Sequence, residues 1–250
     1  MIGATLSDLG LLVPELILVG MASMLVLAAR RIQRAPVAVI GTVLAALAAT
    51  LVAGWDLSGG ARTGFGGMIT LDGYSQFFKV LIGVTLVLAA LLSVRSIDRD
   101  QVPRAEYHVL LLLASTGMML AVSALDLLGV NLGLELMSIC SYILVGIRVE
   151  KPTSNEAATK YFLLSSFASA LLLYGISLIY GVAGTTDLAS IAGAFSGQDT
   201  GSNPLLLAAI GLVTAGLAFK VSAVPFHAWV PDAYQGASTP VAAFLAAGSK

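Results

Sequence analysis

Charged residues are scarce in this sequence. Of its 250 residues, 58% are hydrophobic and 11% are Asp, Glu, Lys or Arg, whereas soluble domains average about 25% charged residues. Thirteen basic and fourteen acidic residues are too few to cover the surface of a soluble globular domain, which is therefore excluded. The single cysteine, Cys140, excludes an internal disulfide and cannot form a zinc site alone. No basic cluster lies outside short loops, so nucleic-acid binding has no support.

Long apolar runs make up most of the chain. About 20 apolar residues cross a bilayer as a helix, and such runs lack the alternation of barrel strands. Three of them contain one ionisable residue each: Glu15 in 10–29, Lys79 in 75–94 and Glu135 in 127–147. The others contain no Asp, Glu, Lys or Arg: 35–55, 107–125, 161–186 and 200–219. The sequence predicts an all-α, polytopic transmembrane bundle of seven spans, with an eighth beginning in 236–250.

Basic residues alternate between the predicted loops. One set of loops carries nine of them: Arg30, Arg31, Arg34, Arg95, Arg99, Arg104, Arg148, Lys151 and Lys160. The other set carries only Arg62. Because cytoplasmic loops are enriched in Lys and Arg, we expect a multi-pass protein of the plasma (inner) membrane with its N-terminus outside.

Glu135 lies near the middle of its span, about 3 Å from the midpoint at 1.5 Å per residue. An ionisable group at that depth costs about 2.5–3.5 kcal/mol and usually faces a bundle interior or takes part in function. Asn131 and Ser138 share its helix face. The alternative is a structural carboxylate that these neighbours satisfy or that remains protonated.

Lys220 follows a charge-free run and precedes another ten residues without Asp, Glu, Lys or Arg. A helix starting near Pro204 places it about 24 Å along the axis. Pro225 cannot donate a backbone hydrogen bond and should break the helix, which leaves a polar pocket beside a buried ammonium. The alternative is a lysine that reaches the interface.

Two further candidates follow Lys220. Lys250 lies about 15 Å into a helix that we expect to begin near Pro240. His227 lies between two prolines and can exchange protons near neutral pH, although an interfacial histidine beside the anchoring Trp229 explains it equally well.

For the remaining ionisable residues we expect structural roles at the membrane interface or at helix ends. We expect Lys79 to extend to the interface, about one turn inside its span. Glu15 is expected in the first span or at its mouth. Asp72 is expected in a loop or as the cap at a helix start, and Asp232 is expected to cap the eighth helix or its approach. His108, near a membrane end, supports no assignment.

Together Glu135, Lys220 and Lys250 predict a proton-transfer chemistry. If the carboxylate and lysine meet, attraction keeps both charged; if they separate, desolvation favours loss of the lysine proton. Repulsion between Lys220 and Lys250 also favours one charge over two. The chain carries no chemistry to drive these steps, so the energy must come from an ion gradient or a coupled partner.

The stretch Phe219–Lys250 strongly resembles the proton-translocating, antiporter-like subunits of respiratory complex I, which also resemble multi-subunit sodium/proton antiporters. The Gly133–Ser138 context of Glu135 is similar too, and Met68–Tyr74 looks most like the subunit N type. The resemblance implies an antiporter-like fold with two inverted five-helix repeats. Residues 1–104 would then form three leading helices, and 105–250 an incomplete first repeat with the Pro-broken helix. A second repeat is expected beyond residue 250.

The resemblance also implies roles and partners. Glu135, Lys220, Lys250 and His227 would transfer protons as part of an NADH-quinone oxidoreductase, a translocase. We expect no cofactor or metal in this chain; flavin, iron–sulfur clusters and quinone would belong to partner subunits. Partners would be lipid and neighbouring antiporter-like and small membrane subunits of complex I. The alternatives are a subunit of a multi-subunit sodium/proton antiporter and a non-conducting assembly scaffold.

Overall fold

The computed structural model describes residues 8–29, 35–100, 102–196 and 203–250, and nearly all of them are helical. The helices are η1 (Asp8–Leu12), α1 (Val13–Ala28), α2 (Ala35–Asp56), α3 (Gly73–Arg99), α4 (Arg104–Ser123), α5 (Leu127–Val145), α6 (Pro152–Ala183), α7 (Leu188–Phe195), α8 (Pro204–Lys220), α9 (Trp229–Gly236) and α10 (Thr239–Ala247). A small antiparallel pair, β1 (Arg62–Gly64) and β2 (Ile69–Leu71), flanks η2 (Phe65–Gly67).

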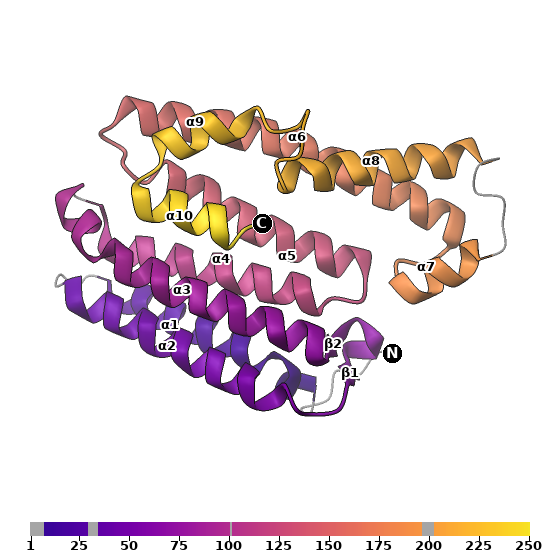
Figure 1. The fold of residues 1–250 in the computed structure, drawn as a ribbon, viewed down its shortest axis with the longest axis horizontal. Coiled ribbons are helices and arrows are strands. Elements are labelled where there is room, and N and C mark those ends of the chain that lie inside the picture. Colours follow the sequence, from indigo (N-terminus) through magenta and orange to yellow (C-terminus); the bar gives the residue numbers. More distant parts are fainter. Residues whose placement is uncertain (1–7, 30–34, 101, 197–202) are drawn as a thin grey trace.

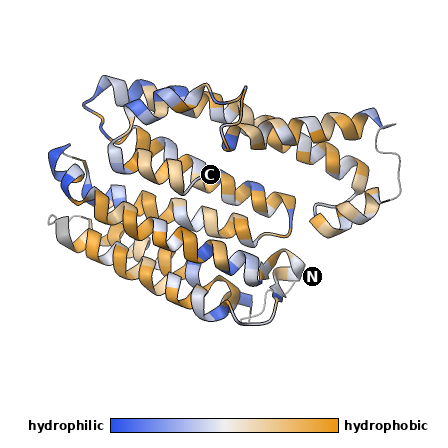
Figure 2. Cartoon of the chain, in the orientation of Figure 1, coloured by the Kyte–Doolittle hydropathy of each residue, from blue (hydrophilic) through white to orange (hydrophobic). Residues whose placement is uncertain are grey.

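The predicted transmembrane bundle is confirmed. Within the described residues, six helices are long and apolar enough to span a membrane, and α8 is a shorter apolar helix of 17 residues. Figure 2 shows hydrophobic residues along the helices and hydrophilic ones gathered mainly at the connections. This distribution follows from the backbone, whose polar groups must be paired within the helix where lipid surrounds it. The protein is therefore a multi-pass membrane protein.

One helix starts earlier than its apolar run. Helix α6 begins at Pro152, whereas hydropathy predicts its span from residue 161. Proline suits a first helical turn, and the added polar turns contain an ion pair between Lys160 and Glu156 of 2.7 Å. Hydropathy marks only the lipid-compatible part of a helix, so it misses this extension.

Helix α3 begins with a capping box, as expected for Asp72. The Asp72 carboxylate accepts from the Ser75 amide at 2.8 Å, and the Ser75 hydroxyl accepts from the Asp72 amide at 3.0 Å. Reciprocal bonds of this kind pair donors that the first turn leaves free.

The helices form adjoining layers (Figure 1). Helices α1–α4 make the lower part of the view, α5 and α10 lie in the middle, and α6, α8 and α9 lie along the top. Small residues permit close packing between α4 and α5. A Cβ atom on Gly117 would lie 2.6 Å from the backbone nitrogen of Met137, so this contact requires glycine.

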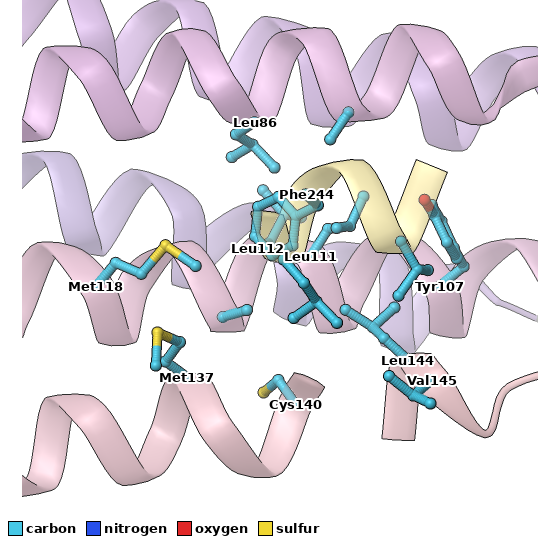
Figure 3. Packing of buried hydrophobic residues seen from close by; sticks show 14 of the residues in the cluster. Leu86, Tyr107, Leu111, Leu112, Met118, Met137, Cys140, Leu144, Val145 and Phe244 are labelled. Carbon is cyan, nitrogen blue, oxygen red and sulfur yellow. The ribbon is translucent and has the colours of Figure 1, made fainter. Parts of the chain in front are cut away.

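A continuous apolar core joins the layers. In Figure 3, Phe244 of α10 lies between Leu86 of α3 and Leu111 and Leu112 of α4. The only cysteine, Cys140, is buried in this core. Packing in this core holds α10 against the rest of the bundle.

The connections lie at alternating ends of the bundle. At one end Asp100, after α3, forms ion pairs with Arg148 and Lys151, after α5. At the other end the Leu125 amide donates to the Met68 carbonyl at 2.8 Å, and the Leu127 amide donates to the Thr186 carbonyl at 2.9 Å. The loops rich in basic residues after α3 and α5 therefore share one end, as the charge pattern predicts. Arg30, Arg31 and Arg34 lie outside the described residues.

Candidate functional site

Lys220 is the last residue of α8, where the helix breaks. Ser222 has a φ of 59°, and the chain resumes a helix only at Trp229. The break predicted from Pro225 is present, but it starts at Lys220, before the proline. The Phe219 carbonyl accepts from the Ser222 amide at 3.0 Å and from the Trp229 indole nitrogen at 3.2 Å. A polar group freed by the break is therefore paired inside the bundle.

The Lys220 ammonium group lies among polar groups of two neighbouring helices, α5 and α6. It donates to the Ser138 hydroxyl of α5 at 2.7 Å and to the Ser169 hydroxyl of α6 at 3.2 Å. The Glu135 carboxylate lies 3.6 Å away. The side chain of Lys220 is 7% exposed and that of Glu135 is 30% exposed. The two residues therefore lie close together in the structure, and the carboxylate is the more accessible of the two.

Lys250 does not join this pair directly. It follows α10, is exposed, and lies 6.0 Å from the Trp229 ring centroid and 5.4 Å from that of Tyr234. Helix α10 ends at Ala247, three residues before the end of the sequence, and the expectation that Lys250 lies inside a continuing helix stays a prediction. Trp229 contacts both the Lys250 ammonium group and the carbonyl that precedes Lys220.

His227 lies in the segment between α8 and α9, and its side chain is exposed. It belongs to the same broken region as Lys220, but the seven-residue spacing does not place the two on one helix face, because the helix is interrupted between them. The proton-transfer roles of Glu135, Lys220, Lys250 and His227 stay predictions.

A second buried ion pair lies between α1 and α3. The Lys79 ammonium nitrogen lies 2.7 Å from a Glu15 carboxylate oxygen, and the side chains are 0% and 4% exposed. The prediction that Lys79 extends to the interface was wrong, because a carboxylate on a neighbouring span compensates its charge inside the bundle. The signal was present in the sequence: each residue is the only ionisable group of its run, with opposite sign.

Two other ionisable residues have distinct surroundings. Asp232 lies in the first turn of α9, whose N-cap is Ala228 with no side-chain cap bond, so the prediction that Asp232 caps a helix was wrong; it forms a 3.0 Å ion pair with Lys160 of α6 instead. His108 is fully buried, and within the described residues neither ring nitrogen has a hydrogen-bond partner. The described residues contain no group of three His, Cys, Asp or Glu side chains that could hold a metal ion.

Comparison with known proteins identifies the family. A family model described as "NADH:quinone oxidoreductase/Mrp antiporter, TM" matches residues 124–250, which include Glu135, Lys220, His227 and Lys250. The chain belongs to this family. The resemblance seen in the Phe219–Lys250 stretch is confirmed, and so is the antiporter-like fold.

Relatives in this family are similar over most of the chain. NADH-quinone oxidoreductase subunit N 2 of Rhizobium meliloti is 42% identical over 243 residues, 95% of this chain and 50% of the relative. NADH-quinone oxidoreductase subunit N of Paramagnetospirillum magneticum is 41% identical over 247 residues, 97% of this chain and 51% of the relative. The chain thus spans about half the length of the curated relatives it matches.

Solved structures show the same fold. A chain of respiratory complex I from Thermus thermophilus with bound aureothin matches with a TM-score of 0.79 and 32% identity, over 95% of this chain and 50% of that one. A chain of an archaeal membrane-bound sulfane sulfur reductase matches with a TM-score of 0.81 and 24% identity, over 97% of this chain and 51% of that one. The latter likeness concerns the fold alone.

Proposed function

We propose that this chain is part of a proton-translocating membrane subunit of an NADH-quinone oxidoreductase. The observation that carries the proposal is the buried Lys220 at the end of α8, held by two serine hydroxyls and 3.6 Å from Glu135. Relatives at 41–42% identity are named as subunits N of that enzyme. No redox chemistry is assigned to this chain; quinone reduction, with flavin and iron–sulfur clusters, belongs to partner subunits.

The pair works as a switch in this proposal. While Glu135 is ionised, it stabilises the Lys220 ammonium charge in a region that water hardly reaches. When the carboxylate is neutralised or moves away, that stabilisation is lost and the lysine gives up its proton more readily. The proton then passes through the broken segment that carries His227 towards Lys250, and Lys220 is reloaded before the pair closes again.

The proposed organisation follows the family resemblance. Residues 1–104 contribute three leading helices, and residues 105–250 contribute the first of two inverted repeats. The partners are neighbouring antiporter-like and small membrane subunits, and lipid. The protein lies in the plasma (inner) membrane with its N-terminus outside, since nine basic residues fall in one set of predicted loops and one in the other.

A second candidate is a subunit of a multi-subunit sodium/proton antiporter, because the description of the family model includes Mrp antiporters. The printed names of the relatives favour the oxidoreductase. A non-conducting scaffold is the third candidate, in which the buried charges only hold helices together.

The test uses the full-length subunit in its complete complex, reconstituted in vesicles. Lys220→Ala and Glu135→Gln are expected to abolish or strongly reduce proton uptake driven by NADH, while the complex still assembles. Lys151→Ala and Glu150→Gln are matched controls, because both side chains are exposed, and they should pump normally.

Three outcomes separate the candidates. Loss of NADH-driven pumping in the two buried variants supports the proposal. Transport that requires sodium and proceeds without NADH supports the antiporter. Unchanged pumping in both buried variants rejects a proton-carrying role and leaves the scaffold.

A further inference from the structure

A groove of about 370 Å³ lies between the end of α3 and the start of α10. The two helices lie side by side in Figure 1 and contact one another. Arg95 and Arg99 line the groove from α3, one turn apart and therefore on one face of the helix. Thr239 lines it from the first turn of α10. One half of the groove is therefore basic and polar.

The two arginines lie where α3 leaves the hydrocarbon core. The apolar run of α3 covers residues 75–94. At 1.5 Å per residue Arg95 lies about 30 Å along the helix from Ser75, which is the thickness of the hydrocarbon core. Arg99 lies about 6 Å further along. Both guanidinium groups are therefore at the level of the phospholipid headgroups.

Arg95 can bind an anion from outside the chain. Its side chain is exposed, and it has no hydrogen bond or ion pair with another described residue. Arg99 donates from Nε to Asp100 at 3.3 Å, but its side chain is 72% exposed, so much of its guanidinium group is open to the surface. A guanidinium group can bind two phosphate oxygens with parallel hydrogen bonds.

The acidic groups at this end of α3 are compensated by other residues. Asp100 also pairs with Arg148 at 3.5 Å and with Lys151 at 3.4 Å. Asp98 pairs with Arg104 at 2.6 Å. These carboxylates therefore do not cancel the positive charge over the groove, and an anion is the complementary occupant.

The other half of the groove is apolar and is lined by Leu92, Pro240 and Ala243. Because α3 runs towards this end of the bundle and α10 runs away from it, Leu92 and Ala243 lie on the membrane side of the arginines. Leu88, one turn before Leu92, continues the apolar surface, and the two leucines are 56% and 61% exposed. An acyl chain can bury against this surface, whereas a free phosphate ion cannot.

We propose that this groove binds an anionic phospholipid, whose phosphate group is held by Arg95 and Arg99 while its acyl chains lie along α3 and α10. Basic pockets between transmembrane helices are known to bind anionic headgroups. The lipid bridges a leading helix and the helix that precedes Lys250. This inference goes beyond the proposed function and uses neither Glu135 nor Lys220; the proposed orientation serves only to assign the lipid to the cytoplasmic leaflet.

The test uses the full-length subunit in its complete complex, purified in detergent and freed of lipid. A phosphatidylglycerol with a photoreactive acyl chain is expected to label peptides of α3 and α10, and unlabelled phosphatidylglycerol should compete. Arg95→Gln and Arg99→Gln should each weaken the apparent affinity about fivefold, and the double variant about thirtyfold, the loss expected for basic residues near a headgroup. Arg95→Lys, which keeps the charge, should retain most of the affinity.

Lys160→Gln is the matched control. Lys160 is also basic and belongs to the same set of predicted loops, but it lines a different cavity, beside α6 and α9, so labelling of α3 and α10 should not change. In the lipid-free complex Arg95→Gln should unfold at the wild-type temperature, because its side chain is exposed. A loss of labelling in this variant then reports on the lipid and not on the fold.

Competition in the wild-type complex separates headgroup charge from apolar contact. Phosphatidylcholine with the same acyl chains should compete at least tenfold less well than phosphatidylglycerol. Equal competition by the two lipids would show that only apolar contact holds the lipid and would overturn the proposal. Competition by inorganic phosphate as strong as by phosphatidylglycerol would indicate a site for a free anion and would also overturn it.

Absence of labelling in the complete complex would show that another part of the complex covers the groove, which would overturn the proposal as well. If an arginine variant fails to assemble, the wild-type competition series decides the matter. Labelling is measured without NADH, so its failure leaves the proposed function intact. Wild-type pumping in Lys220→Ala would refute the proposed function and leave the lipid site unaffected.

Discussion

Lys79 and Glu15 form a salt bridge of 2.7 Å between α3 and α1, and neither side chain is open to the surface. Both polar atoms of the Gln76 amide, one turn before Lys79, also lack a hydrogen-bond partner in the described part of the chain. The leading helices therefore contain a polar centre of their own. A buried pair contributes little net stability compared with apolar residues, but removal of one partner leaves an uncompensated charge.

Removal of one member of this pair should be more damaging than removal of both. Lys79→Met is expected to destabilise the protein by about 3–5 kcal/mol, whereas Lys79→Met with Glu15→Gln should be much closer to wild type. Thermal unfolding of the detergent-purified complex measures the difference, with Arg95→Met, at an exposed position, as control. If the single and the double variant lose the same stability, the uncompensated charge of Glu15 is not the cause of the destabilisation.

Gly117 should not tolerate a side chain. Because its Cβ would lie 2.6 Å from the backbone nitrogen of Met137, Gly117→Ala must push α4 away from α5, and we expect a loss of about 1–3 kcal/mol. Gly211→Ala in α8 is the control, because nothing lies within 4 Å of its Cβ position; it should be neutral or stabilising by up to about 1 kcal/mol. If Gly117→Ala and Gly211→Ala lower the unfolding temperature by the same amount, the close contact between α4 and α5 does not explain the loss.

Asp100 should make stability depend on pH at the acidic end. Burial acts to raise its pKa, but hydrogen bonds from Arg99 and Lys151 and the charge of Arg148 leave the pKa below its ordinary value. A carboxyl with a lowered folded-state pKa stabilises the fold above its unfolded pKa of about 3.9, and the contribution is lost as pH falls through the folded-state value.

The comparison is between wild type and Asp100→Asn across pH 3–7. The variant should be less stable near neutral pH, and the gap should close below about pH 4. Thermal unfolding at each pH provides the measurement. A gap that stays constant down to pH 3 would show that the carboxylate charge does not matter.

Trp229→Phe should destabilise the non-helical segment between α8 and α9. Phenylalanine keeps a ring to stack on Tyr161, whose centroid lies 4.3 Å from that of Trp229, but it loses the bond to the Phe219 carbonyl. We expect a stability loss of about 1 kcal/mol, typical of one hydrogen bond, with a decrease in pumping. Trp55→Phe, at an exposed position, should change neither, and a similar result for the two variants would count against the role of the indole nitrogen.

Cysteine labelling tests the orientation. The native Cys140 is buried, so a cysteine introduced at exposed Ser58 or Glu150 can be followed against a low background. In intact cells a membrane-impermeant thiol reagent should label Ser58→Cys and should reach Glu150→Cys only after the membrane is opened. The reverse pattern would place the N-terminus inside.

The sequence alone determined that this is a helical membrane protein, because long apolar runs in lipid can pair their backbone groups only as helices. It also determined the candidates Glu135 and Lys220, since an ionisable group in such a run is conspicuous, and the Phe219–Lys250 stretch indicated the family. Only the tertiary structure decided which charges meet. Hydropathy records neither the rotation of a helix nor its neighbours, so the Glu15–Lys79 pair, the aromatic surroundings of Lys250 and the hydroxyls beside Lys220 emerged only when the helices were packed together.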